Sequence, residues 1–449
     1  MKIIKKLNSI LIEKIGLRGQ DEKLLISGSA NIIIIKIFGL LIGFGVQILL
    51  ARVMGVNEYG DYIYVLTWIN LVGLFSKFGF DSASKKFLPI LYTQENWSGL
   101  FGYVRYTSKF VFITGLLFVL TSVLSAYFFD RNQLSLIFLA GAFVLLINNQ
   151  LGLFSSFLEA IREFYKSLIP TNIIRPLGIV LGVVIYYIVS ESVKSEYVMY
   201  INAVSTLFAL VIAYGWLKSS TKSPDESIST TIDDKKEWRN ISYSLLLVSG
   251  IHIVLNEMDT IILGILISTE SAGVYKSAIK IGHLALFGFN AVELVIAPTI
   301  AKLYAENDSI GIQQIVSKGV LIMMAVSFPL LIFLWFFGGS ILLLYGPEFL
   351  IGFTSMKILL VCQVINVITG SVINLMTMTK YQKETLYVFS MSLVFNLVLN
   401  LVLIPIYGME GAAWATGITT IVWNITALLF IRKKLKVDPS IFHYFKKTI

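Results

Sequence analysis

The stretch that decides the fold is residues 249–304, SGIHIVLNEMDTIILGILISTESAGVYKSAIKIGHLALFGFNAVELVIAPTIAKLY. Two apolar runs, each long enough to cross a bilayer as a helix, are joined here by a short turn. Charged and polar groups interrupt both runs, and such groups are costly inside hydrocarbon. The pattern therefore predicts a membrane-embedded helical hairpin with polar residues of functional importance. These residues are His252, Asn256, Glu257, Asp259, Lys276, Lys280, His283 and Glu293.

The composition extends this interpretation to the whole chain. Of 449 residues, 56% are hydrophobic and only 14% are charged, with a mean hydropathy of +0.79. These values lie outside the range of soluble globular proteins and predict a polytopic membrane protein. The net charge of +9 does not indicate nucleic-acid binding, because the basic residues form no single patch with interleaved aromatics. The single cysteine, Cys362, excludes disulfides and thiolate metal clusters.

Twelve apolar segments of about 20 residues can be placed along the chain, which predicts an all-α protein with twelve transmembrane helices. With both termini cytoplasmic, few basic residues fall in the outer loops, namely Arg52, Arg131 and Lys194, as the positive-inside rule requires. The expected spans are 29–50, 59–80, 107–129, 134–158, 168–189, 196–217, 241–266, 272–300, 315–337, 350–378, 385–406 and 410–431.

A polar linker at residues 218–239 divides the spans into two lobes of six helices, 29–217 and 240–431. We expect residues 1–28 to form a basic amphipathic helix on the cytoplasmic leaflet and residues 432–449 to form a basic cytoplasmic tail. The lobes also share a short pattern. Glu58, Gly60 and Tyr62 recur, with one residue inserted, as Glu270, Gly273 and Tyr275. Parallel repeats of this kind predict a substrate site between the two lobes.

Five basic residues lie well within predicted spans: Lys36, Arg175, Lys276, Lys280 and Lys357. Each would cost about 3 kcal/mol if it faced lipid, so all five are expected to face water, protein or an anion. Lys276, Lys280 and His283 follow one helical stripe, which indicates a shared direction.

Two roles are open for the acidic residues Glu257 and Asp259. One is an ion pair with Lys276 or Lys280, and the other is the binding of a coupling ion, H⁺ or Na⁺. For the bases, function is favoured, because only three acids lie clearly inside the membrane, the third being Glu293. A cavity with surplus positive charge suits an anionic cargo such as phosphate or pyrophosphate.

Several short motifs resemble those of the polysaccharide flippases of the O-antigen type, within the superfamily that also holds lipid II flippases and multidrug and toxin extrusion transporters. They are Ala51-Arg52-Val53-Met54-Gly55, Glu58-Tyr59-Gly60-Asp61-Tyr62, Asp259-Thr260-Ile261-Ile262-Leu263-Gly264, Gly273-Val274-Tyr275, Leu303-Tyr304-Ala305-Glu306 after Pro298, and Pro405-Ile406-Tyr407-Gly408-Met409-Glu410-Gly411-Ala412-Ala413.

The resemblance implies a V-shaped pair of six-helix bundles in the bacterial cytoplasmic (inner) membrane. By alternating access, they would move undecaprenyl-pyrophosphate-linked oligosaccharide to the outer leaflet for surface polysaccharide biosynthesis. Lys36 is similar to the basic residue in span one of lipid II flippases, where arginine is usual. Those flippases tend to have two further helices, so the shorter chain favours the O-antigen type. A polysaccharide polymerase and glycosyltransferases are the implied partners.

Two other classes remain as alternatives. A cation-coupled multidrug exporter would be expected to have an acid-dominated cavity, which the surplus of bases argues against. A membrane polymerase or ligase usually needs a long outer loop, whereas the outer loops here, such as 268–272 and 406–409, are short. No phosphate-binding loop and no metal-ligand spacing of histidines occurs. We therefore expect a transporter rather than an enzyme, without a cofactor.

Overall fold

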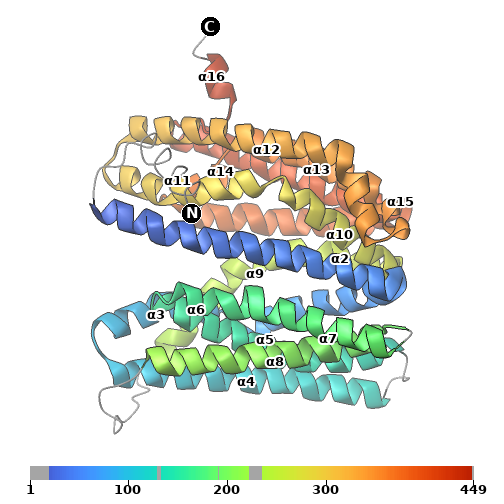
Figure 1. The fold of residues 1–449 in the computed structure, drawn as a ribbon. Coiled ribbons are helices and arrows are strands. Elements are labelled where there is room, and N and C mark those ends of the chain that lie inside the picture. Colours follow the sequence, from blue (N-terminus) through green and yellow to red (C-terminus); the bar gives the residue numbers. More distant parts are fainter. Residues whose placement is uncertain (1–19, 129–132, 191, 222–234, 447–449) are drawn as a thin grey trace. The chain divides into compact units, whose positions relative to one another are not determined.

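The computed structural model describes residues 20–128, 133–190, 192–221 and 235–446, and every regular element among them is a helix (Figure 1). The predicted all-α class is confirmed for these residues. Residues 1–19 of the expected amphipathic helix, residues 222–234 of the linker and residues 447–449 of the tail lie outside them. The helices are α2 (Gln20–Lys77), α3 (Phe80–Thr93), α4 (Trp97–Phe128), α5 (Gln133–Ala160), α6 (Phe164–Ile169), η1 (Pro170–Ile174), α7 (Arg175–Val189), α8 (Ser195–Ser220), α9 (Lys235–Leu266), α10 (Thr269–Leu284), α11 (Phe287–Ala305), α12 (Ser309–Tyr345), η2 (Pro347–Gly352), α13 (Phe353–Thr369), α14 (Val372–Thr377), α15 (Gln382–Lys434) and α16 (Phe442–Lys446).

Eight helices of the described ranges are long and apolar enough to cross a membrane. The number rises to ten when each of two bent pairs is counted as one span. In α9, Lys235–Leu247 and Gly250–Leu266 meet at 42°, and Thr269–Leu284 meets Phe287–Ala305 at 56°. The chain is thus a multi-pass membrane protein, as its composition predicts.

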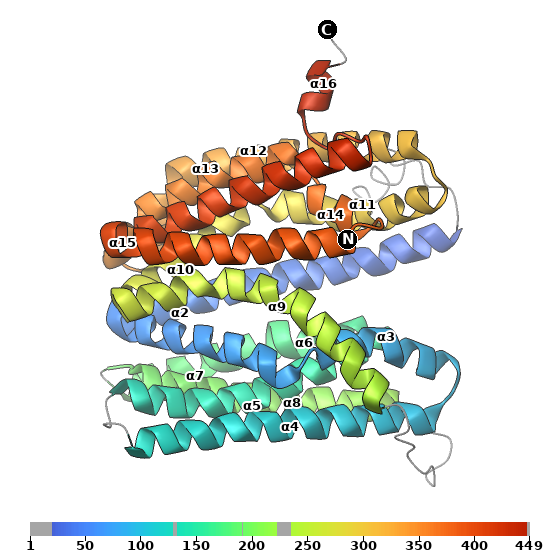
Figure 2. The same cartoon turned by 180° about the vertical axis from the view of Figure 1, so that it is seen from behind.

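Two of these helices, α2 and α15, are too long for a single crossing. They contain 58 and 53 residues, so a straight helix would measure roughly 80–90 Å, about three times the hydrocarbon thickness. Glycines with positive φ interrupt both, Gly55 (φ 75°, ψ 172°) and Gly408 (φ 56°, ψ −129°). At Gly408 the chain folds back, and the two legs of α15 run side by side (Figure 2). Asn396 Nδ2 and Thr416 Oγ1 are 3.5 Å apart across the turn. The two legs of α15 correspond to the expected spans 385–406 and 410–431.

The helices form two compact units, and we describe each by itself. Unit 1 comprises Met1–Val53 and Val72–Leu246, and unit 2 comprises Met54–Leu71 and Leu247–Ile449. The boundaries fall inside α2 and α9, whereas the sequence analysis places the boundary in the linker. The division into two lobes of six spans therefore stays a prediction.

Four large aromatic side chains lie in the buried core of unit 1. Phe80, Tyr103, Phe157 and Trp238 are each at most 4% exposed and belong to one buried cluster. The ring centroids of Tyr103 and Trp238 are 5.0 Å apart. Large aromatic residues bury 150–250 Å² each, so Trp238 is expected to contribute strongly to fixing the start of α9 against α4.

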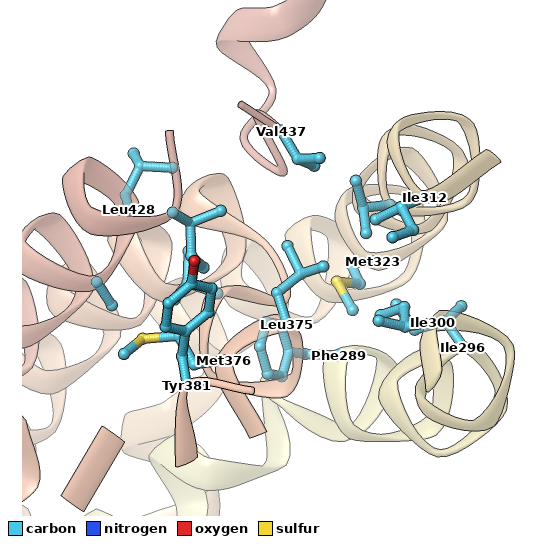
Figure 3. Packing of buried hydrophobic residues seen from close by; sticks show 14 of the residues in the cluster. Phe289, Ile296, Ile300, Ile312, Met323, Leu375, Met376, Tyr381, Leu428 and Val437 are labelled. Atoms are coloured by element: carbon cyan, nitrogen blue, oxygen red, sulfur yellow. The ribbon is translucent and has the colours of Figure 1, made fainter. Parts of the chain in front are cut away.

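The core of unit 2 is mainly aliphatic and sulfur-containing (Figure 3). Phe289 of α11, Met323 of α12 and Leu375 of α14 pack together, and Tyr381 lies beside them just before α15. Val437, which follows α15 in the chain, also belongs to this cluster. The segment after α15 therefore returns to the core.

This returning segment, residues 437–441, is called the strap below. The side chain of Gln313 bonds both backbone groups of Asp438, donating to its carbonyl at 2.8 Å and accepting from its amide at 2.7 Å. Arg432 forms an ion pair of 2.8 Å with the Asp438 carboxylate. The amide of Ile441 donates to a carbonyl in the last turn of α13. The strap thus joins α12, α13 and α15 at one end of unit 2.

Candidate functional site

Polar residues of α9 lie on the part of the helix that belongs to unit 2. His252 and Asn256 are exposed, Glu257 is half-buried and Asp259 is buried. The spacing of one turn brings the first two together, and Asn256 Nδ2 is 2.9 Å from His252 Nδ1. The ring of His252 also meets Phe389 of α15 edge-on, with the centroids 6.3 Å apart.

Asp259 is held by three neutral donors and is only 3% exposed. The hydroxyl of Tyr275 donates to its carboxylate at 3.0 Å, and Asn400 Nδ2 donates at 2.7 Å. The hydroxyl of Thr416 is the third donor. The donors come from α10 and from both legs of α15. No ion pair of the described residues includes Asp259.

Further oxygen atoms surround this carboxylate. Asn400 Nδ2 also donates to Asn396 Oδ1 at 3.0 Å. The side-chain oxygen of Asn400 itself, Oδ1, is buried and has no hydrogen-bond partner among the described residues. A buried acceptor without a partner is uncommon and costs free energy unless something binds it. One carboxylate with several amide and hydroxyl oxygens is a suitable ligand set for a proton or a hard cation.

Glu257 and Lys276 form one of the ion pairs that the sequence left open. The carboxylate of Glu257 and Lys276 Nζ are 2.5 Å apart. Asn70 Nδ2 also approaches the Glu257 carboxylate, at 3.4 Å, and Lys276 Nζ donates to the carbonyl of Asn256 at 3.3 Å. Lys276 is therefore neutralised within unit 2.

Lys280 and His283 continue the stripe of α10 beyond this pair. Lys280 is half-buried, and no ion pair or hydrogen bond of the described ranges includes it. His283 is exposed. The positive charge left over in this part of unit 2 is therefore carried by Lys280.

Lys357 lies in a different environment, against aromatic rings. Its Nζ is 4.3 Å from the ring centroid of Phe353 and 5.1 Å from that of Trp335. Such cation–π contacts stabilise an ammonium group without neutralising it. No interaction within the described part of the chain joins Lys357 to Lys276 or Lys280. Its expected role in binding substrate stays a prediction.

The other two predicted bases belong to unit 1. Arg175 follows the π-helical turn η1 and precedes Pro176. Single π-helical turns in proteins are frequent at functional sites. It donates from Nε and Nη2 to Asn202 Oδ1, at 3.2 and 3.1 Å, and from Nη1 to Asn148 Oδ1 at 2.7 Å. Lys36 is exposed on α2, one turn before Gly39, which packs against Asn172.

The sequence analysis missed the neutral partners of these charges. Asn396 and Asn400 lie one turn apart in an apolar run, and this spacing was a signal that they share a buried face. Thr416 gave no such signal, because threonine is common in membrane helices. Asn148 and Asn202 could not be assigned to Arg175 without knowing which helices pack together.

The family model described as polysaccharide biosynthesis protein matches residues 25–304, which is more than half of the chain. The chain belongs to this family. The match includes the motifs at Arg52, Gly60, Asp259 and Gly273, so the resemblance stated from these motifs is confirmed.

The chain is similar to two proteins of Haloferax volcanii that are named as flippases. The probable flippase AglR is 27% identical over 187 residues, 41% of this chain and 39% of AglR. The probable low-salt glycan biosynthesis flippase Agl15 is 25% identical over 256 residues, 55% of this chain and 51% of Agl15. The chain thus aligns with about half or less of each. The uncharacterized membrane protein MJ1068 of Methanocaldococcus jannaschii is 23% identical over 422 residues, 88% of this chain and 81% of that protein.

Solved structures with the same fold include two transporters. An inward-facing multidrug resistance transporter of the MATE family gives a TM-score of 0.69 at 11% identity and covers 89% of this chain and 94% of its own. The lipid II flippase MurJ in an inward closed conformation gives 0.66 at 15% identity, with 89% and 87% covered. At these identities the likeness concerns the fold alone.

Proposed function

We propose that this chain is a flippase that moves undecaprenyl-pyrophosphate-linked oligosaccharide from the cytoplasmic to the outer leaflet for surface polysaccharide biosynthesis. Family membership, the flippase names of two relatives and the multi-pass membrane fold support the proposal. In this proposal the chain crosses the membrane twelve times in two six-helix lobes arranged as a V, with both termini cytoplasmic. The glycine breaks in α2 and α15 support the count, because each adds one crossing to the ten apolar spans.

The observation that carries the proposal is the unneutralised Lys280. Glu257 pairs with Lys276, whereas Glu270 and Glu293, the nearest acids before and after Lys280 in the chain, form no described ion pair with it. An ammonium group without an acidic partner in a membrane span is costly, so it is retained where it performs a function. A pyrophosphate group would supply the missing negative charge through charge-assisted hydrogen bonds.

The remaining bases would extend the path of the headgroup. We place Lys36 and Arg175 at its cytoplasmic part, and Lys276, Lys280, His283 and Lys357 at its outer part. Arg175 is oriented by two asparagine side chains, so its planar guanidinium is prepared to bind an anion. The lipid tail would remain in the bilayer throughout, because exposing a long hydrocarbon chain to water costs about 0.8 kcal/mol for each CH₂.

Asp259 is the proposed coupling site. A proton or Na⁺ would bind the Asp259 carboxylate, either in place of its three neutral hydrogen-bond donors or together with them. Asn400 Oδ1, which has no hydrogen-bond partner among the described residues, offers one more oxygen ligand. Binding of the ion would change the charge of a buried carboxylate, and this change is large enough to favour one conformation over another.

The test compares Lys280→Ala and Lys280→Arg in cells that lack the native protein. Lipid-linked glycan is labelled from the outer face of the membrane, and its total is measured in parallel. We expect Lys280→Ala to retain the glycan in the inner leaflet, while Lys280→Arg keeps much of the activity because the charge remains. Lys302→Ala, which removes an exposed base at the end of α11, is the control.

Normal outward transport in Lys280→Ala, with the protein present at normal levels, would contradict the role of this residue. If loss of the whole protein leaves the glycan distribution unchanged, the flippase proposal itself fails. Export of a cationic dye that depends on Asp259 would then favour the multidrug exporter.

A further inference from the structure

A stripe of residues along α4 combines two cations with exposed apolar side chains. Arg105 and Lys109 are exposed and lie one turn apart. Phe112, Leu116 and Leu120 follow at intervals of three and four residues and are 48%, 39% and 50% exposed. These spacings put all five on one face of the helix. Over about 22 Å, the face changes from basic to apolar, as a phospholipid changes from headgroup to chain.

Two further cations come from the start of α9. Trp238 fixes this part of α9, because its ring lies 5.0 Å from Tyr103 and 5.9 Å from Tyr106 of α4, measured between centroids. Lys235 Nζ lies 5.9 Å from the centroid of Tyr106, in the same turn of α4 as Arg105. Arg239 is exposed one turn further along α9. We call Arg105, Lys109, Lys235 and Arg239 the basic face.

Some cations of unit 1 are neutralised by ion pairs, unlike those of the basic face. Lys77, Lys85 and Lys166 each pair with an acid, at 2.9 to 3.0 Å. No ion pair or hydrogen bond of the described residues includes any member of the basic face. Glu237, the acid in the described first turn of α9, is exposed and forms no ion pair there. Counted over the described residues of α4 and α9, these four cations and Glu237 leave a net positive charge.

An apolar path also connects the two helices below these cations. The ring of Phe78 lies between Phe110 of α4 and Tyr243 of α9, with centroid distances of 5.5 and 5.9 Å. Tyr243 is 50% exposed and follows Arg239 by one turn. Along the chain direction, the exposed cations of both α4 and α9 therefore precede their exposed apolar side chains.

We propose that α4 and the start of α9 bind an anionic phospholipid of the surrounding membrane. The phosphodiester contacts the basic face, and an acyl chain lies along Phe112, Leu116 and Leu120. Phosphatidylglycerol has the required charge, whereas phosphatidylethanolamine carries a compensating ammonium group. The occupant is a structural lipid and is distinct from the transported substrate.

The test uses the full chain in detergent, titrated with phosphatidylglycerol or phosphatidylethanolamine and measured by native mass spectrometry. The variant is Arg105→Gln, Lys109→Gln and Arg239→Gln combined. Each basic residue near a membrane surface contributes about a fivefold change in binding, so the triple variant is expected to bind phosphatidylglycerol on the order of 100-fold more weakly at low salt. The matched control removes three exposed cations of α15, Lys383, Lys433 and Lys434, and should change binding less than twofold.

The proposal is overturned if the basic-face variant binds phosphatidylglycerol as the unaltered protein does, or if the control variant loses as much affinity. It is also overturned if the unaltered protein binds both phospholipids equally. Displacement of phosphatidylglycerol by stoichiometric undecaprenyl pyrophosphate would assign the basic face to the substrate instead. A monodisperse elution profile verifies that each variant is folded.

Discussion

Tyr275→Phe tests whether Asp259 is ionised and held by hydrogen bonds. Tyr275 is 0% exposed, and its hydroxyl donates to the Asp259 carboxylate at 3.0 Å. The substitution removes one oxygen atom and leaves the ring in place, so the effect of a cavity is small. A hydrogen bond to a charged group contributes about 1.5–3 kcal/mol, and we expect a loss of about 2 kcal/mol.

The assay is thermal unfolding of the purified protein in detergent. In a unit of about 200 residues, 1 kcal/mol corresponds to roughly 2–4 °C, so Tm should fall by about 4–8 °C. Tyr243→Phe is the control, because the Tyr243 side chain is 50% exposed and has ring contacts only. It should shift Tm by less than about 1 °C.

A double-mutant cycle with Asp259→Asn completes the experiment. If the hydroxyl bonds the carboxylate, the two substitutions should be coupled by at least about 1 kcal/mol. Additive effects, or a Tyr275→Phe shift as small as that of the control, would refute the reasoning. The same cycle in the presence of NaCl or KCl would detect a cation at the site.

Other predictions concern packing, the strap and Arg175. A Cβ on Gly273 would lie 2.7 Å from the backbone of Gly60, so Gly273→Ala should destabilise the protein by about 3 kcal/mol, while Gly43→Ala, with no atom within 4 Å, should not. Asp438→Ala should lower Tm through loss of about 2 kcal/mol, because Arg432 keeps a half-buried charge without its partner. Arg175→Lys should slow outward transport about tenfold at unchanged expression, since lysine cannot bond both asparagines in the same plane; unchanged transport would contradict this role.

The helical class could be predicted from the sequence, because it follows from periodicity and hydrophobicity. Lys276 and Glu257 illustrate the limit. Their helical positions could be predicted, but which acid pairs with which base depends on side-chain directions in two helices. Gly408 illustrates a clearer signal, since a glycine between two apolar runs of membrane length predicts the fold-back that the two legs of α15 make.

The polar partners of Asp259 could not be predicted, because three different segments supply them. Tyr275 follows Asp259 by 16 residues, Asn400 by 141 and Thr416 by 157. Only the packing of both legs of α15 against α9 and α10 brings these groups together. Arg175 presents the same difficulty, since its two asparagines lie 27 residues before and after it.

The strap also has a consequence for biogenesis. Its residues leave the ribosome after every helix that they join, so α12, α13 and α15 must insert into the bilayer before Asp438 can reach Gln313. Until then, the Gln313 amide and the Arg432 guanidinium lack Asp438 as a partner and remain accessible to water and to quality-control proteases. Released chains that are truncated before residue 437 should therefore be degraded faster than released chains that are truncated after residue 441.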